Sequence, residues 1–217
     1  AASRSERVAY IVMLAGPGVP GIDILVAQGE LINRAGGAPE VIIEMNSRVQ
    51  RSLADIVKRE PDPEVAGPLM RAIMRDELEN LPSDIKEALP ESQVGDLAIN
   101  TTVNQINSPW FRFFLHHDPR PVLERVSVPV LAIFGEKDLQ VPHELNVPEI
   151  EAAFQRGNNG DTTVRVLPGL NHLFQQAESG SPSEYQQIEE TFNQSALELV
   201  SSWILERFAT PKQDTLS

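Results

Sequence analysis

The chain has 217 residues, 41% of them hydrophobic and 23% charged, with a formal net charge of −13. The length suits one domain, or a domain with an insertion. The composition is that of a globular protein and not of a disordered chain. The acidic balance argues against nucleic acid as a partner, because contact with phosphates needs clustered Lys and Arg. With no cysteine in the chain, disulfides, thiolate chemistry and Cys-ligated metals are excluded. No apolar run approaches the roughly 20 residues needed to cross a bilayer, and nothing in the composition indicates a cellular compartment.

Three short apolar runs predict buried parallel strands, because they are nearly continuous in apolar residues rather than alternating. They are residues 8–15, 128–134 and 163–167, of which the last is interrupted by Arg165. The first run is as apolar as a central strand, which would have a neighbour on each side.

Between the first two predicted strands lies a long helical stretch, roughly from Gly21 to Asn107, with apolar residues near helical spacing. Pro39 and Pro63 stand where the first turn of a helix accepts proline. Residues 148–156 predict a further helix, and residues 183–209 predict a closing amphipathic helix. This order predicts an α/β fold, with a parallel sheet and flanking helices.

A glycine motif follows the first predicted strand. The segment GPGVPG, residues 16–21, matches G-x-G-x-x-G, and Glu40 and Glu44 follow it about 20 residues on, as in a dinucleotide site. Such a loop works by presenting backbone N–H groups to a pyrophosphate, and Pro17 and Pro20 remove two of these donors. We therefore interpret the motif as the exit from a strand into the inserted helical segment, without a cofactor.

Asp138 and His172 carry the main candidate chemistry. Asp138 follows the second predicted strand and His172 follows the third, in LPGLNHLFQ. The carboxyl ends of adjacent parallel strands lie side by side, so the residues just beyond them can converge. A carboxylate there can orient an imidazole and stabilise its protonated form, which leaves the second ring nitrogen as a general base. Taken singly, Asp138 is more typical of a turn or a helix cap, and His172 of a loop histidine without a task. Their joint placement after successive strands, beside glycine-containing turns, favours the functional interpretation.

A weaker candidate is the sequence LHHDP, in which His116, His117 and Asp118 suggest a metal site. Two adjacent histidines point in different directions, and no further ligand is evident, whereas metal sites need several ligands. A solvated loop is the better interpretation.

Two segments carry a resemblance to a known family. Residues 108–142, SPWFRFFLHHDPRPVLERVSVPVLAIFGEKDLQVP, and residues 164–191, VRVLPGLNHLFQQAESGSPSEYQQIEET, resemble the C-terminal part of a serine-dependent α/β-hydrolase. They are similar to bacterial carboxylesterases and to the related serine-aminopeptidase-like and acyl-hydrolase groups. The resemblance implies that Asp138 is the acid and His172 the base of a catalytic triad. It also implies a partial hydrolase core at residues 1–16 and 109–217, a helical cap at residues 17–108, an ester substrate and no cofactor or metal.

The chain departs from that family in one respect: it contains no G-x-S-x-G, the strand-to-helix elbow that carries the nucleophile. Ser3 and Ser5 lack the flanking glycines of such an elbow. We therefore expect a truncated hydrolase whose nucleophilic serine lies upstream of Ala1, and we expect this chain alone to be inactive.

Two further expectations follow. A strand from Val8 to Ala15 without its neighbour would expose an apolar edge, so we expect self-association or pairing with the missing N-terminal half through that edge. The alternative to an enzyme is a non-catalytic interaction domain that retains the α/β-hydrolase scaffold.

Overall fold

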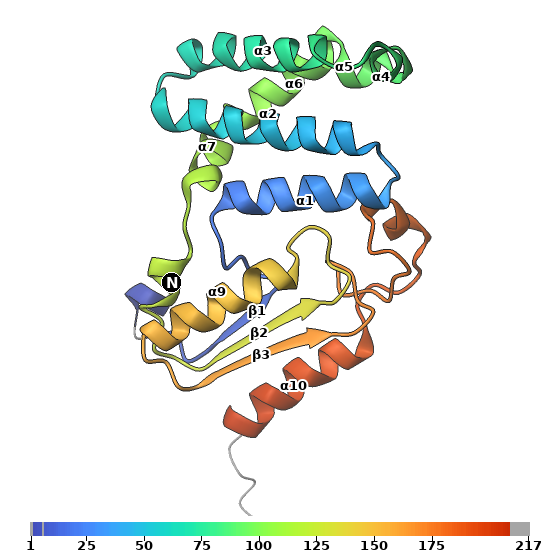
Figure 1. The fold of residues 1–217 in the computed structure, drawn as a ribbon. Coiled ribbons are helices and arrows are strands. Elements are labelled where there is room, and N and C mark those ends of the chain that lie inside the picture. Colours follow the sequence, from blue (N-terminus) through green and yellow to red (C-terminus); the bar gives the residue numbers. More distant parts are fainter. Residues whose placement is uncertain (1, 6, 209–217) are drawn as a thin grey trace, which may run out of the picture. The chain divides into compact units, whose positions relative to one another are not determined.

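A computed structural model describes residues 2–5 and 7–208 of the chain (Figure 1). The chain forms two compact units. The sheet unit consists of Ala1–Gly16 and Arg120–Ser217, and the helical unit consists of Pro17–Pro119. Within the described residues, no helix has both the length and the apolar character required to span a membrane.

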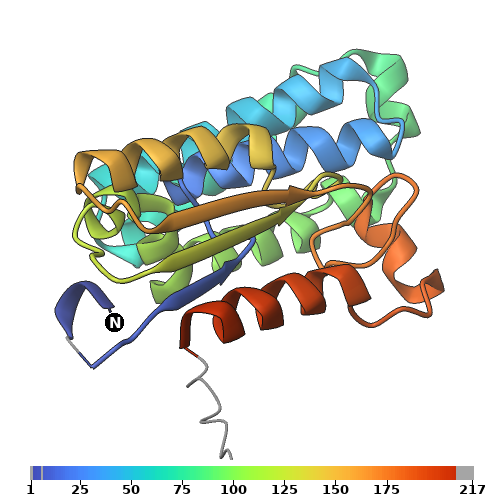
Figure 2. The same cartoon turned by 90° about the horizontal axis from the view of Figure 1, so that it is seen from below.

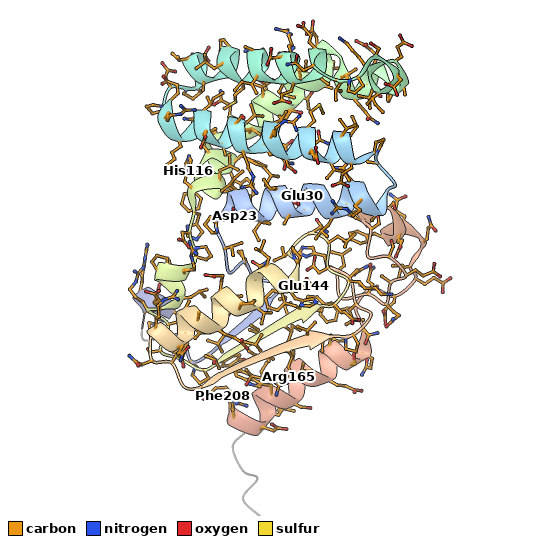
Figure 3. All side chains as sticks on the ribbon, viewed as in Figure 1. Asp23, Glu30, His116, Glu144, Arg165 and Phe208 are labelled. Atoms are coloured by element: carbon orange, nitrogen blue, oxygen red, sulfur yellow. The ribbon has the colours of Figure 1, made fainter. Side chains whose placement is uncertain are left out.

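The sheet unit contains a small parallel sheet of three strands in the order β1-β2-β3. The strands are β1 (Ile11–Leu14), β2 (Val130–Gly135) and β3 (Thr162–Leu167). All three strands predicted from the sequence are present, with bounds shifted by up to three residues. β2 is buried along its whole length because it is the central strand. Arg165, labelled in Figure 3, is exposed on β3, which is an edge strand and therefore tolerates a charge.

Helices cover both faces of this sheet. Figures 1 and 2 show α9 (His143–Arg156) and α10 (Gln194–Phe208) on opposite sides of the strands. Phe134 of β2, Phe154 of α9 and Trp203 of α10 belong to one buried cluster. The shorter elements of the unit are η1 (Ala2–Arg4), α8 (Arg120–Leu123) and η2 (Pro182–Gln187).

The predicted closing helix over residues 183–209 is wrong in its first half. Only η2 and α10 are helical there, and residues 188–193 between them form no helix. Their backbone is bonded elsewhere: the Glu190 carbonyl accepts from the Gln175 side chain, and the Asn193 N–H donates to Phe174. α10 begins directly after Asn193, whose side chain accepts a hydrogen bond from the Ser195 N–H as a helix cap. Residue 209 lies outside the described residues.

The helical unit confirms that the predicted insertion is helical. Pro39 is the N-cap of α2, and Pro63 is the first residue of α3, where the Asp62 carboxylate accepts from the Glu64 N–H. Buried side chains such as Leu53, Met70 and Val103 form its main core. The helices are α1 (Gly21–Ala35), α2 (Glu40–Arg59), α3 (Pro63–Glu79), α4 (Ser83–Ala88), α5 (Glu91–Val94), α6 (Asp96–Ile106) and α7 (Pro109–His116).

The boundary between the units differs from the sequence-based boundary at residue 108. α7 packs within the helical unit, so that unit extends to Pro119. The physical reason is the amphipathic character of α7, whose Leu115 and Phe111 pack into the main core of the helical unit.

Candidate acid–base site

Asp138 is held at the end of β2 by a tight turn. The Asp138 N–H donates to the Gly135 carbonyl over 3.3 Å. One side-chain oxygen, Oδ1, accepts from the N–H groups of Gln140 and Val141, both at 2.8 Å. The Asp138 side chain is completely buried. Asp138 therefore does act as a turn residue, but only one of its two oxygens is used in that way.

The second oxygen faces His172. The loop after β3 turns at Gly169, which has φ +72°, and a bridge between Leu170 and Gln176 closes the hairpin that carries the histidine. His172 Nδ1 lies 2.9 Å from Asp138 Oδ2. The His172 side chain is 29% exposed, so part of it is accessible to solvent. The structure thus brings together the two residues that the sequence predicted.

This contact fixes the role of each ring nitrogen. A carboxylate can only accept a hydrogen bond, so Nδ1 of His172 is the protonated nitrogen and Nε2 carries the lone pair of the neutral ring. Within the described residues, His172 makes no hydrogen bond other than the one to Asp138. Nε2 is therefore available to take a proton from an incoming group.

The two loops are tied together directly before Asp138. Glu136 Oε2 accepts from the Gly169 N–H over 2.8 Å. Lys137 Nζ donates to the carbonyls of residues 177 and 178, each at 2.8 Å. The sequence reasoning missed both residues, because a charged pair after a strand is also typical of a solvated turn.

A pocket of about 520 Å³ lies beside His172. Leu14 at the end of β1 contributes to one wall, and Leu173, Ile188 and Phe192 contribute apolar side chains from the loops after β3. The pocket belongs entirely to the sheet unit. The His172 side chain therefore lies beside a hollow that has room for a reacting group.

Tyr185 lies close to the buried carboxylate. Its phenolic oxygen accepts a hydrogen bond from Gln140 Nε2 over 2.7 Å. Burial raises the pKa of Tyr185 above its ordinary value of 10.0, and the negative charge of Asp138 raises it further, while the bond from Gln140 acts in the opposite direction. The pKa of this phenol therefore responds to the charge state of Asp138.

The other sequence candidates do not assemble into sites. His116, labelled with Asp23 in Figure 3, is exposed at the end of α7, and His117 stacks on Phe113. Among the residues that the structure describes, no group of three or more metal-ligating side chains could hold an ion. At the glycine motif, the Gly21 N–H donates to the His117 carbonyl, so this donor already has a protein partner.

Comparison with family models, with curated proteins and with solved structures found no match to this chain.

Proposed function

We propose that the chain carries the acid and the base of a serine hydrolase that cleaves carboxylic esters. The observation that carries this proposal is the 2.9 Å contact between His172 Nδ1 and Asp138 Oδ2, made by loops that follow neighbouring parallel strands. The order of the two residues along the chain, acid before histidine, is that of the α/β-hydrolases.

In the proposed reaction a serine Oγ attacks the ester carbonyl carbon while its proton passes to His172 Nε2. The tetrahedral intermediate then expels the alcohol, which takes that proton, and an acyl-enzyme remains. Water attacks the acyl group, gives a proton to Nε2, and the serine leaves with that proton as the carboxylic acid is released. Asp138 stays ionised throughout and stabilises the imidazolium.

We place the attacking serine outside this sequence. Ser3 and Ser5 precede β1, whereas Asp138 and His172 follow the carboxyl ends of β2 and β3, so the two serines belong to the opposite end of the parallel sheet. In the described part of the chain, no hydroxyl group bonds to His172.

Among the described residues, one edge of β1 pairs with no strand, and this free edge supports the placement. The N–H groups of Ile11 and Ala15 donate to β2 and its flanking residue, so by alternation those of Val12 and Leu14 face away from β2. A further parallel strand on that edge would end beside Leu14, which lines the same pocket as His172. A turn following that strand could bring a serine to Nε2. We propose the helical unit, inserted between β1 and β2, as the cap of this hydrolase.

Two steps test the proposal. The DNA that encodes the residues before Ala1 should contain a continuous reading frame with G-x-S-x-G. The extended polypeptide should then hydrolyse a short-chain chromogenic ester, and the present chain should not. Hydrolysis by the present chain that is abolished by His172→Ala would contradict the external nucleophile, and an extended polypeptide without activity would contradict the hydrolase.

The second candidate is a non-catalytic interaction domain, and the unpaired edge of β1 favours it as a binding surface. A start codon in the DNA immediately upstream of Ala1, in place of a reading frame with G-x-S-x-G, would support this candidate instead of the enzyme.

A further inference from the structure

The backbone of His172 is positioned by its neighbours. Within the described residues His172 makes one hydrogen bond, and this bond comes from its ring and not from its backbone. Asn171, directly before it, is completely buried. We propose that Asn171 is a positioning residue, whose side chain fixes the turn around His172 and so holds the ring against Asp138. This inference rests on the function proposed above.

The Asn171 side chain bonds to the residues that follow His172. Its Oδ1 accepts from the N–H of Leu173 over 2.9 Å and from the N–H of Gln175 over 3.0 Å. Its Nδ2 donates to Gln175 Oε1 over 3.0 Å. A side-chain amide has two donors and a carbonyl oxygen that accepts twice, so only one donor of Asn171 is unused in these bonds. The side chain thus bridges across His172.

Backbone bonds close the same turn. The Asn171 N–H donates to the Gln175 carbonyl, and the Phe174 N–H donates to the Asn171 carbonyl, both at 3.0 Å. Phe174 has φ +57°, a left-handed conformation that is unfavourable for a residue with a large side chain. Such a conformation persists only where its surroundings hold it. The Asn171 bonds on either side of it supply part of that restraint.

Gln175 extends the restraint to the wall of the pocket. Its Nε2 donates to the Glu190 carbonyl over 2.9 Å, and the Gln176 N–H donates to Glu190 Oε2 over 2.7 Å. Both Gln175 and Glu190 line the pocket beside His172. Asn171 therefore belongs to a network that fixes the histidine and the pocket wall together.

Asn159 provides a matched control. Its Nδ2 donates to the carbonyls of Val126 and Val128, each at 2.9 Å, and its Oδ1 accepts from the Asp161 N–H over 3.1 Å. It is thus also a side-chain amide with bonds to backbone, but it precedes β3 rather than following it. Asn159→Ala removes a comparable set of bonds without touching the His172 turn.

The experiment measures solvent exchange of the His172 Nδ1 proton by NMR on the whole chain, assigned by its loss in His172→Ala. We expect Asn171→Ala to accelerate this exchange about tenfold or more, the factor that corresponds to ~1.4 kcal/mol, and Asn159→Ala to leave it as in the wild type. Exchange in Asn171→Ala as slow as in the wild type would overturn the inference.

Two further variants decide the matter if Asn171→Ala does not fold. Both variants lose the Nδ2 donor to Gln175 Oε1. Asn171→Asp keeps an oxygen at the position of Oδ1 for the N–H groups of Leu173 and Gln175, whereas Asn171→Ser provides a shorter acceptor. We expect faster exchange in Asn171→Ser than in Asn171→Asp, and equal rates would contradict the inference. Asp138→Asn tests the contact between Asp138 and His172 separately. If the exchange rate of the Nδ1 proton is the same in this variant as in the wild type, the Asp138–His172 bond and the proposed function both fail.

Discussion

Gly135 lies where β2 packs tightly against the loop that carries His172. A Cβ atom at this position would lie 2.3 Å from the Leu170 carbonyl oxygen and 2.5 Å from that of Asn171. We expect Gly135→Ala to displace that loop and to lower the free energy of unfolding by about 1–3 kcal/mol, the usual cost of overpacking. Urea denaturation measures this loss.

Gly160→Ala is the control for that substitution. A methyl group at residue 160 would have no atom within 4 Å of it apart from those of Gly160 and its two chain neighbours, and the φ of Gly160 is not in the left-handed region. We expect the free energy of unfolding of this variant to stay within about 0.5 kcal/mol of the wild type. Equal stability of the two variants would show that the close contact at Gly135 is absent.

Tyr185 reports on the charge of Asp138. Burial raises the pKa of the Tyr185 phenol above 10.0, and the Asp138 carboxylate adds to this shift. In a Tyr10→Phe background, where Tyr185 is the remaining tyrosine of the sequence, absorbance should show phenolate formation with a midpoint above 10.0. Asp138→Asn should lower that midpoint, because it removes the neighbouring negative charge.

The raised pKa of Tyr185 also makes the free energy of unfolding depend on pH. A phenol whose pKa is raised in the folded state stabilises the fold fully below the unfolded value, and this contribution is lost as the pH rises through the folded value. A midpoint that does not move in Asp138→Asn would contradict the proximity of these two side chains.

Among the elements, the loop after the His172 turn depends on one carboxylate. Glu184 accepts from the Ser179 hydroxyl, from the Ser179 N–H over 2.8 Å and from the Glu178 N–H over 3.1 Å. The hydroxyl bond is the largest cause of the lowered pKa of Glu184, and the N–H bonds lower it further. A group with a lowered pKa stabilises the folded loop above its ordinary value of 4.5, and this contribution disappears as the pH falls through the lower folded value.

We therefore expect amide exchange at Glu178 and Ser179, corrected for the intrinsic pH dependence, to accelerate as the pH falls below 4.5. Glu184→Gln should show no such acceleration, because its side chain does not titrate. The same acceleration in both proteins would mean that another group controls this loop.

The sequence predicts both the strands and the pairing of Asp138 with His172, for one physical reason. The apolar run at β2 marks a central parallel strand, and parallel strands bring the residues beyond their carboxyl ends together, as with Asp138 and His172. Asn171 and Gln175 could not be predicted in the same way. Their bonds depend on how a short turn folds back, and neither residue type is specific for such a turn. The apolar pattern of the predicted closing helix likewise gives no sign of the Glu190 bonds that interrupt it.

For the whole molecule, the free edge of β1 predicts association. By alternation the Leu14 N–H faces away from β2, and the residue is 49% exposed. Leu14→Pro removes the outward N–H without removing a bond to β2. We expect light scattering to show concentration-dependent association of the wild type and of Leu14→Ala, and a monomer for Leu14→Pro. Association that persists unchanged in Leu14→Pro would exclude pairing through this edge.

The division of the chain into two units was predictable in outline and not in detail. Proline and helical periodicity between the first two strands indicated an insertion. The sequence of α7, which follows Ser108, has no feature that distinguishes it from the segments of the sheet unit. Its place in the helical unit comes from the packing of Phe111 and Leu115 into the core of that unit.

The central claim is that Asp138 and His172 activate a serine. Its most direct test is reaction of the extended polypeptide, including the residues encoded before Ala1, with a fluorophosphonate, followed by mass spectrometry. The account predicts an adduct on one serine upstream of Ala1, formed on the order of 10⁴-fold more slowly in Asp138→Asn and on the order of 10⁶-fold more slowly in His172→Ala. An adduct that forms equally fast in His172→Ala, or no serine adduct at all, would contradict the claim.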